Sequence, residues 1–352
     1  MKRTLSIVSA LALILLTACD KETRSDSPDT NVPITFQVAG EASGTRGTPI
    51  NPGSGSDKSM DVGSTFDVRC HEGTSATASF SDYAEVKSAS SAEFNTTRNW
   101  PNNTVDLKFF AVHPRQTTIT STNTEMTVTG FTINGTFANQ EDLLYTYKMQ
   151  SSSSKTPVTL RFKHALTRVT FQMQLTGTNA AFTNVYVSKI ELQNTFTKGT
   201  VVTTNTPTVK SWAGSVRATV STGTVAAASA QRLDGKSASA GDTSADTYAG
   251  ATHGYWNVFA STNKNNSFLM IPMTVAELNN ATTPVKIAVT LMVNGAERGP
   301  YIVSGLGDKG AWTDGTHINY QLKFDVAKEG MTLGGITVAS WGTTTDYPVD
   351  LN

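Results

Sequence analysis

Apolar and polar residues alternate along most of this chain. The clearest case is 318–324, where Ile318, Tyr320, Leu322 and Phe324 alternate with polar residues. A period of two places the apolar side chains on one face of a strand. Apolar residues at helical spacing do not persist over ten residues, so the pattern predicts an all-β protein. Further strands are predicted at 105–111, 158–162, 165–175 and 287–293, and a strand with a bulge at 126–133.

The same pattern predicts two turns. The apolar phase changes between Phe162 and Ala165, which indicates a bulge or turn near His164. His164 is in phase with the apolar residues before it, so we expect a hydrogen-bonded histidine that faces the core. Asn294-Gly295, after the strand at 287–293, is typical of a two-residue hairpin turn.

The first eighteen residues have the features of an export signal. Two basic residues precede an apolar run that ends at Ala18 and is shorter than the ~20 residues that span a bilayer. Small residues followed by Cys19 match the bacterial lipobox, in which this cysteine is lipidated. A chance cysteine after an ordinary signal peptide is the alternative. Residues 1–18 are therefore predicted to be a lipoprotein signal peptide and Cys19 the lipidation site.

A strand and an arginine follow. Val32, Ile34, Phe36 and Val38 share one face at period two, and the proline at position 33 suits an edge strand because it has no N–H to donate. The next segment, 40–59, is rich in glycine and poor in apolar residues, and it contains Arg46 and Gly47. We expect this arginine to be exposed in extended, mobile chain.

The last residues of the chain repeat the pattern of that strand. Tyr347, Val349 and Leu351 alternate with polar residues, and a proline again occupies the second position. A cut at Arg46 that removed the first strand would leave an open apolar groove and unpaired edge amides, which seek another strand. Three large apolar side chains would contribute on the order of 5–9 kcal/mol to filling it. Such a head-to-tail contact does not close on itself and generates a filament.

Two other interpretations stay open. In the plainer one, 32–38 is simply the first strand of the fold, Arg46 is an ordinary loop residue and 347–351 is a frayed tail. In the other, the chain is a monomeric surface lipoprotein that binds glycan, through exposed aromatic residues, or a host ligand. The candidates for such stacking are Trp212, Tyr255 and Trp256.

Charge and cysteine content narrow the partners. The 352 residues include 28 basic and 28 acidic residues without a run of like charges, so we expect no nucleic-acid surface. Removal of 1–18 takes two basic residues and leaves a net charge of −2, so membrane attachment would need the lipid. A cut after Arg46 leaves 23 residues of each sign. Because lipidation would consume Cys19, the other of the two cysteines, Cys70 has no disulfide partner within the chain. It is predicted to be either a small buried hydrophobe or a reactive thiol beside His71.

Motifs for catalysis, metals or cofactors are weak. Residues 305–310 fit G-x-G-x-x-G, but a turn and a strand follow where a dinucleotide site needs a helix. The five histidines lack metal-ligand spacing. A hydrolase would need a carboxylate pair that only folding brings together. We therefore expect no enzyme activity, no metal and no cofactor.

Two stretches bear on domain organisation. The four serines at 151–154 predict a domain boundary near residue 155. The residues between Ala213 and His253 are mostly small and polar, which predicts long surface loops within the second domain.

With these residues in hand, the chain resembles the fimbrillin family, the lipoprotein-derived subunits of type V pili in anaerobic bacteria. The resemblance rests on the order of several loose motifs along nearly the whole chain. They are the lipobox at Cys19, the Thr45-Arg46-Gly47-Thr48 segment, the LRFKHALTRV stretch at 160–169, Trp312 with Gly315 and Tyr320, and the ITVASW stretch at 336–341.

The resemblance implies two transthyretin-like β-sandwich domains in tandem after a propeptide at 19–46. With the boundary that the serines predict near residue 155, these domains would be 47–155 and 156–352. It also implies export to the outer membrane as a lipoprotein. A trypsin-like, arginine-specific protease would then cleave between Arg46 and Gly47, and the subunit would join other pilus subunits in an extracellular pilus that supports adhesion.

Strand exchange is the assembly mechanism that the resemblance implies. The donor strand would lie within 336–352 and would replace the propeptide strand of a neighbouring subunit. Stalk subunits of the family have both a cleavable arginine and a donor tail, so this chain resembles a stalk subunit. Its modest length and the 213–253 region leave a tip or accessory role open.

Overall fold

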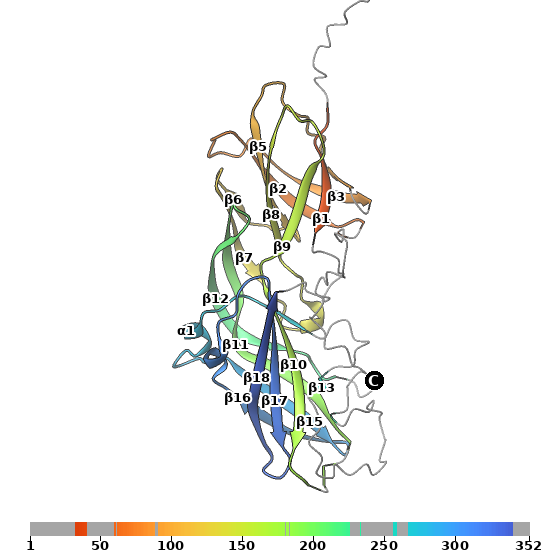
Figure 1. Cartoon of the computed structure of the whole chain (residues 1–352), viewed down its shortest axis with the longest axis vertical. Helices are drawn as coiled ribbons and strands as arrows, with labels where there is room; N and C mark the ends of the chain where they lie inside the picture. The colour runs from red at the N-terminus through yellow and green to blue at the C-terminus, as the bar shows by residue number, and fades with distance from the viewer. Residues whose placement is uncertain are drawn as a thin grey trace, which may run out of the picture.

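The computed structural model shows an elongated molecule with a β-barrel at one end and two packed sheets at the other (Figure 1). Strands dominate, and the all-β prediction is confirmed. The residues that the structure describes are 32–40, 60, 62–88, 91–179, 181–182, 184–225, 233, 256–258 and 267–340.

The barrel contains the N-terminal strands. Its closed order is β1-β4-β3-β2-β5-β8-β9, and its interior is filled by apolar side chains from all seven strands. The bounds are β1 Thr35–Gly40, β2 Thr65–Glu72, β3 Phe80–Ser88, β4 Ser91–Phe94, β5 Asp106–His113, β8 Leu144–Ser151 and β9 Val158–His164.

The two sheets at the other end share a second, larger apolar core. One has the order β13-β10-β17-β18, with β14 also paired to β10, and the other has the order β16-β15-β11-β7-β6, with β12 paired to β11. The bounds are β6 Ile119–Ser121, β7 Glu125–Thr132, β10 Thr167–Thr176, β11 Val185–Thr204, β12 Val209–Ser221, β13 Trp256–Asn257, β14 Phe268–Met270, β15 Lys286–Val293, β16 Ala296–Val303, β17 Thr316–Asp325 and β18 Gly330–Ser340.

Helical structure is confined to short turns in the described part of the chain. Helix α1 (Val275–Leu278) begins with a capping box formed by Thr274 and Glu277, and η1 (Phe137–Asn139) and η3 (Leu306–Lys309) are 3-10 turns. The glycine-rich loop at 305–310 contains η3 and leads back to a strand, so it lacks the helix of a dinucleotide site. Among the described residues, none of these helices has the length and apolarity needed to cross a bilayer.

Several strands lie where the alternation predicts them. β5, β9, β10, β15 and β17 match the predicted segments, and β7 has the predicted bulge opposite β11. The β15–β16 hairpin turns at Asn294-Gly295, both with positive φ, as a two-residue turn of this type requires. The phase change near His164 marks the passage of the chain from the barrel, through β9, into the packed sheets, through β10.

Two predictions about organisation need correction. The boundary near residue 155 falls inside the barrel, because β9 follows it and pairs with β8 and β1. Conversely, β6 and β7 precede residue 155 and pair in the sheet of β11. The predicted surface loops from 213 begin too early, since 213–221 belong to β12, an edge strand of mostly small and exposed residues. The tandem transthyretin-like arrangement stays a prediction.

Strand β5 joins the two cores. Its side chains alternate between the interior of the barrel, with Leu107 and Phe109, and the core of the packed sheets, with Phe110 and Val112. A strand that buries both faces reads as a continuous apolar run, and 107–112 is such a run apart from Lys108. The barrel therefore rests directly on the packed sheets.

Candidate functional site

Strand β1 closes the barrel by pairing on both of its sides. It is antiparallel to β4 through Thr35 and Phe36, and parallel to β9 from Phe36 to Gly40. The proline at 33 predicts an edge strand, and that prediction is wrong for β1. The missing N–H is tolerated because Pro33 precedes the regular strand and forms only an isolated bridge with Asn99.

The apolar face of β1 points into the barrel. Ile34, Phe36 and Val38 are all buried, and Phe36 is 1% exposed. The Phe36 ring packs edge-on against those of Phe94 and Phe109, with centroids 4.8 and 5.8 Å away. Ile34, Phe36 and Val38 share one buried face, as the period of two predicts, and Val32 is half-buried at the edge of the same cluster.

Residues before β1 extend the contact along the segment after β4. The amide of Ile34 donates to the Arg98 carbonyl (2.6 Å), and the amide of Trp100 donates to the Val32 carbonyl (2.9 Å). Segment 32–40 is therefore bonded first to 92–100 and then to β9. We call the space that it fills, between these two segments, the β1 slot.

Because β1 is paired on both sides, its loss would open the closed barrel and would not merely remove an edge strand. Three large buried side chains would leave, which costs on the order of 5–9 kcal/mol of burial, and β4 and β9 would expose unpaired backbone groups. Cys70 is buried in the same core, and burial raises the pKa of its thiol. This supports the buried-hydrophobe interpretation of Cys70 over a reactive thiol.

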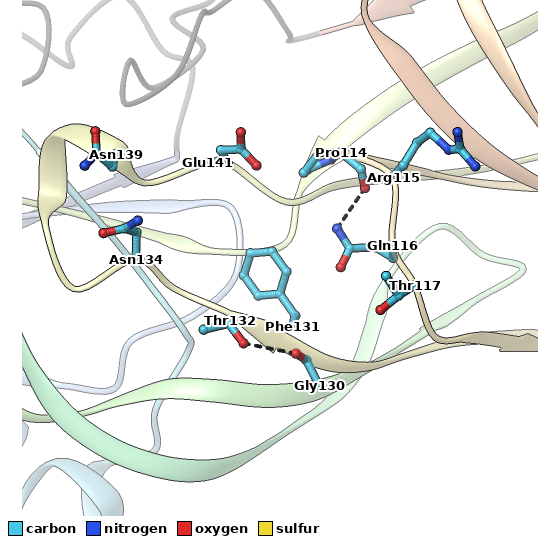
Figure 2. Close-up of a pocket in the computed structure, with 10 residues that line it drawn as sticks. All are labelled: Pro114, Arg115, Gln116, Thr117, Gly130, Phe131, Thr132, Asn134, Asn139 and Glu141. Atoms are coloured by element: carbon cyan, nitrogen blue, oxygen red, sulfur yellow. Dashed lines mark hydrogen bonds between the residues drawn. The ribbon is translucent and has the colours of Figure 1, made fainter.

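A hollow of about 710 Å³ lies at the junction of barrel and sheets (Figure 2). Its polar side chains are largely engaged within the chain. Gln116 donates to the Pro114 carbonyl (2.8 Å), and Thr132 donates to the Gly130 carbonyl (3.2 Å). Arg115 pairs with Asp67 (3.3 Å) outside the hollow. We therefore interpret the hollow as a structural feature of the junction between the barrel and the packed sheets.

Other candidate residues have structural roles. Trp212 is half-buried, donates its indole N–H to the Ala165 carbonyl (2.9 Å) and packs against Phe131, so it is no free stacking surface. Tyr255 and the side chain of Trp256 lie outside the described residues. His164 is buried and contacts the Asp142 carboxylate (2.6 Å), as expected for a core histidine. Within the described ranges, His, Cys, Asp and Glu form no cluster that suits a metal.

The remaining predicted site residues lie outside the described residues: Cys19, Arg46, Gly47, Tyr347, Val349 and Leu351. The predicted donor segment 336–352 needs a correction, because 336–340 belong to β18 and pair with β17 of the same chain. Trp100, which fills the barrel beside β1, was not predicted from the sequence. Its only signal was a large aromatic residue in an otherwise polar turn region.

Most of the chain is similar to one known protein family. The model of the fimbrillin-like family matches residues 54–341, most of the chain. The chain belongs to the fimbrillin-like family. This fimbrillin-like chain is therefore a pilus-associated protein of the cell surface, in a family of structural rather than enzyme-like proteins. No curated protein matches its sequence.

Several solved structures are similar to this chain at low sequence identity, and the first described here shares its fold. A fimbrial protein from Bacteroides vulgatus is 13% identical, with a TM-score of 0.51 over 87% of this chain and 99% of that chain. A candidate cell adhesion protein from Bacteroides uniformis is 13% identical (TM-score 0.49, 88% and 98% covered). A fimbrilin from Porphyromonas gingivalis is 7% identical (TM-score 0.42, 90% and 99% covered).

Proposed function

We propose that this fimbrillin-like chain is a stalk-type structural subunit of a cell-surface pilus and supports adhesion. It is exported as a lipoprotein through Cys19, matured by an arginine-specific protease that cuts after Arg46, and polymerised by β-strand complementation. The observation that carries the proposal is the place of β1, which completes the barrel from both sides although Arg46 follows it by only six residues.

Cleavage would convert β1 into a separate peptide. A cut after Arg46 would leave 32–40 held by backbone pairing and by three apolar side chains, without a covalent link to β2. The barrel would then exchange one strand for another at little net cost, provided that the incoming strand offers comparable apolar side chains.

The C-terminal tail supplies such a strand. Twelve residues follow β18, and fully extended they reach about 40 Å, whereas the seven residues 32–38 need about 23 Å. Tyr347, Val349 and Leu351 alternate with polar residues as Ile34, Phe36 and Val38 do. A tail that enters the slot of a second copy forms a head-to-tail contact, which propagates as a filament.

The test separates the two faces of the tail. One variant carries serine at Tyr347, Val349 and Leu351, and the matched control carries serine at Pro348, Asp350 and Asn352. Each chain is cleaved with trypsin and filament growth is followed by light scattering and electron microscopy. We expect the first variant to remain monomeric and the control to polymerise. Filaments from the first variant, or equal growth of both, would contradict the proposal.

A further inference from the structure

The barrel core contains a polar hydrogen without a partner. Trp100 is 2% exposed and packs edge-on against Phe109, and its indole N–H has no acceptor among the described residues. It is the only unpartnered side-chain donor or acceptor that the structure describes in this core. A buried N–H that gives up water without gaining an acceptor destabilises the state that contains it.

Trp100 lies at one end of the β1 slot. Pro33 and Asn99 form a bridge, and Trp100 donates its backbone N–H to the Val32 carbonyl. This register places Trp100 directly across from Val32 and diagonal to Ile34, on the face that points into the barrel. Diagonal neighbours in a sheet are within reach of an aromatic side chain.

The propeptide strand offers this indole no acceptor in a side chain, because Val32, Ile34, Phe36 and Val38 are all hydrocarbon. The tail offers a nearly matching set. Valine is common to both strands, leucine is an isomer of isoleucine, and tyrosine differs from phenylalanine by one oxygen. The three buried side chains 34, 36 and 38 and the three tail side chains 347, 349 and 351 therefore differ in composition by a single hydroxyl.

We propose that the Tyr347 hydroxyl of a second copy accepts the hydrogen of the Trp100 indole when the tail occupies the slot in the direction of β1. This inference rests on the proposed function. The incoming strand thus makes a hydrogen bond that the propeptide strand cannot make, and the difference favours exchange.

If the tail runs in the same direction as β1, it can be aligned with β1 in two ways, and both bring Tyr347 next to Trp100. Matching the buried positions one for one puts Tyr347 in the place of Ile34, diagonal to Trp100. Matching the prolines puts it in the place of Val32, directly across. The opposite direction puts Tyr347 at the Val38 end. Tyr347 does not fit in the place of Phe36, because the rings of Phe66, Phe94 and Phe109 surround that position and accept no hydroxyl hydrogen bond of ordinary strength.

Synthetic tail peptides test the contact on the full chain. Peptides of residues 341–352 with Tyr347 or with Tyr347→Phe are added during trypsin cleavage, and the concentration that halves filament growth is measured. The net contribution of a hydrogen bond between two uncharged groups predicts that the Phe peptide inhibits about three- to tenfold more weakly than the Tyr peptide. On a Trp100→Phe chain, which lacks the donor, we expect the two peptides to inhibit equally.

The matched control is Trp212→Phe, which removes an indole in the packed sheets that is bonded to Ala165. It should keep the difference between the peptides. Because the peptide comparison on the unchanged chain needs no substitution in the barrel, misfolding of the Trp100 variant does not remove the test. The indole proton resonance of Trp100 provides a second readout and should shift downfield with the Tyr peptide only.

The outcomes separate the two proposals. If neither peptide inhibits growth, strand complementation by the tail is wrong. If both inhibit equally on the unchanged chain, complementation stands and the Tyr347–Trp100 contact is wrong. A difference that persists on the Trp100→Phe chain also contradicts the contact.

Discussion

The first and last strands that the structure describes differ in how firmly they are held. β1 pairs on both sides and closes a barrel, and its apolar side chains are buried. β18 pairs only with β17 among the described strands, at the edge of its sheet, and Val338 on it is 58% exposed. The strand that maturation would remove is therefore the better packed of the two. If maturation removes β1, as proposed, this contrast favours replacement by another strand over dissociation alone.

The largest predicted effect compares the centre of β1 with the surface of β18. We expect Phe36→Ala to lower the free energy of unfolding of the uncleaved chain by about 3–5 kcal/mol, because it leaves a cavity between three aromatic rings. Val338→Ala should change it by less than about 0.5 kcal/mol. Urea unfolding followed by circular dichroism measures both. Equal losses of stability in the two variants would contradict the tighter packing of β1.

A conservative substitution in each strand probes the same difference in packing. Ile34→Val removes one buried methylene and should cost about 0.5–1.5 kcal/mol, whereas Ile336→Val, on the half-buried face of β18, should cost less. The same urea titration is sensitive enough when the two variants are measured side by side. A greater loss at Ile336 would mean that β18 is the more tightly packed strand.

The smallest effect concerns pH. Burial lowers the pKa of His113, at the end of β5, against the opposing influence of the Thr65 carbonyl and nearby carboxylates. The unfolded chain takes up a proton near pH 6.5 while folded His113 resists it, so stability is complete above that pH and falls as pH drops toward the folded pKa. His113→Gln should flatten the decrease in the urea midpoint between pH 7.5 and 5.5. An unchanged decrease would exclude His113 as its source.

The strands were readable from the sequence because half-buried strands alternate. β17 and the β15–β16 hairpin were predicted from Ile318–Phe324 and Asn294-Gly295, and both are present. β12 was missed because its small, mostly exposed residues show no such alternation. Local periodicity reports which residues share a face, and it was informative wherever one face is buried and the other exposed.

Pairing between strands that lie far apart in the chain could not be predicted from the sequence. The proline at 33 suggested an edge, yet β1 pairs in parallel with β9 more than 110 residues later, as in Phe36 with Val158. Likewise the serines before residue 155 resemble a linker, although β9 after them returns to the barrel. Alternation fixes the face of a strand but leaves its neighbours open, so the slot and Trp100 emerged only from the fold.

Release of β1 from the barrel during maturation can be tested on the assembled pilus. Surface filaments should be purified, dissociated and analysed by N-terminal sequencing and intact mass. We expect chains that begin at Gly47, with no peptide from residues 19–46 in the preparation, and no filaments from cells with Arg46→Ala. Filaments whose chains begin at Cys19, or that retain the 19–46 peptide in equal amount, would show that β1 stays in the barrel.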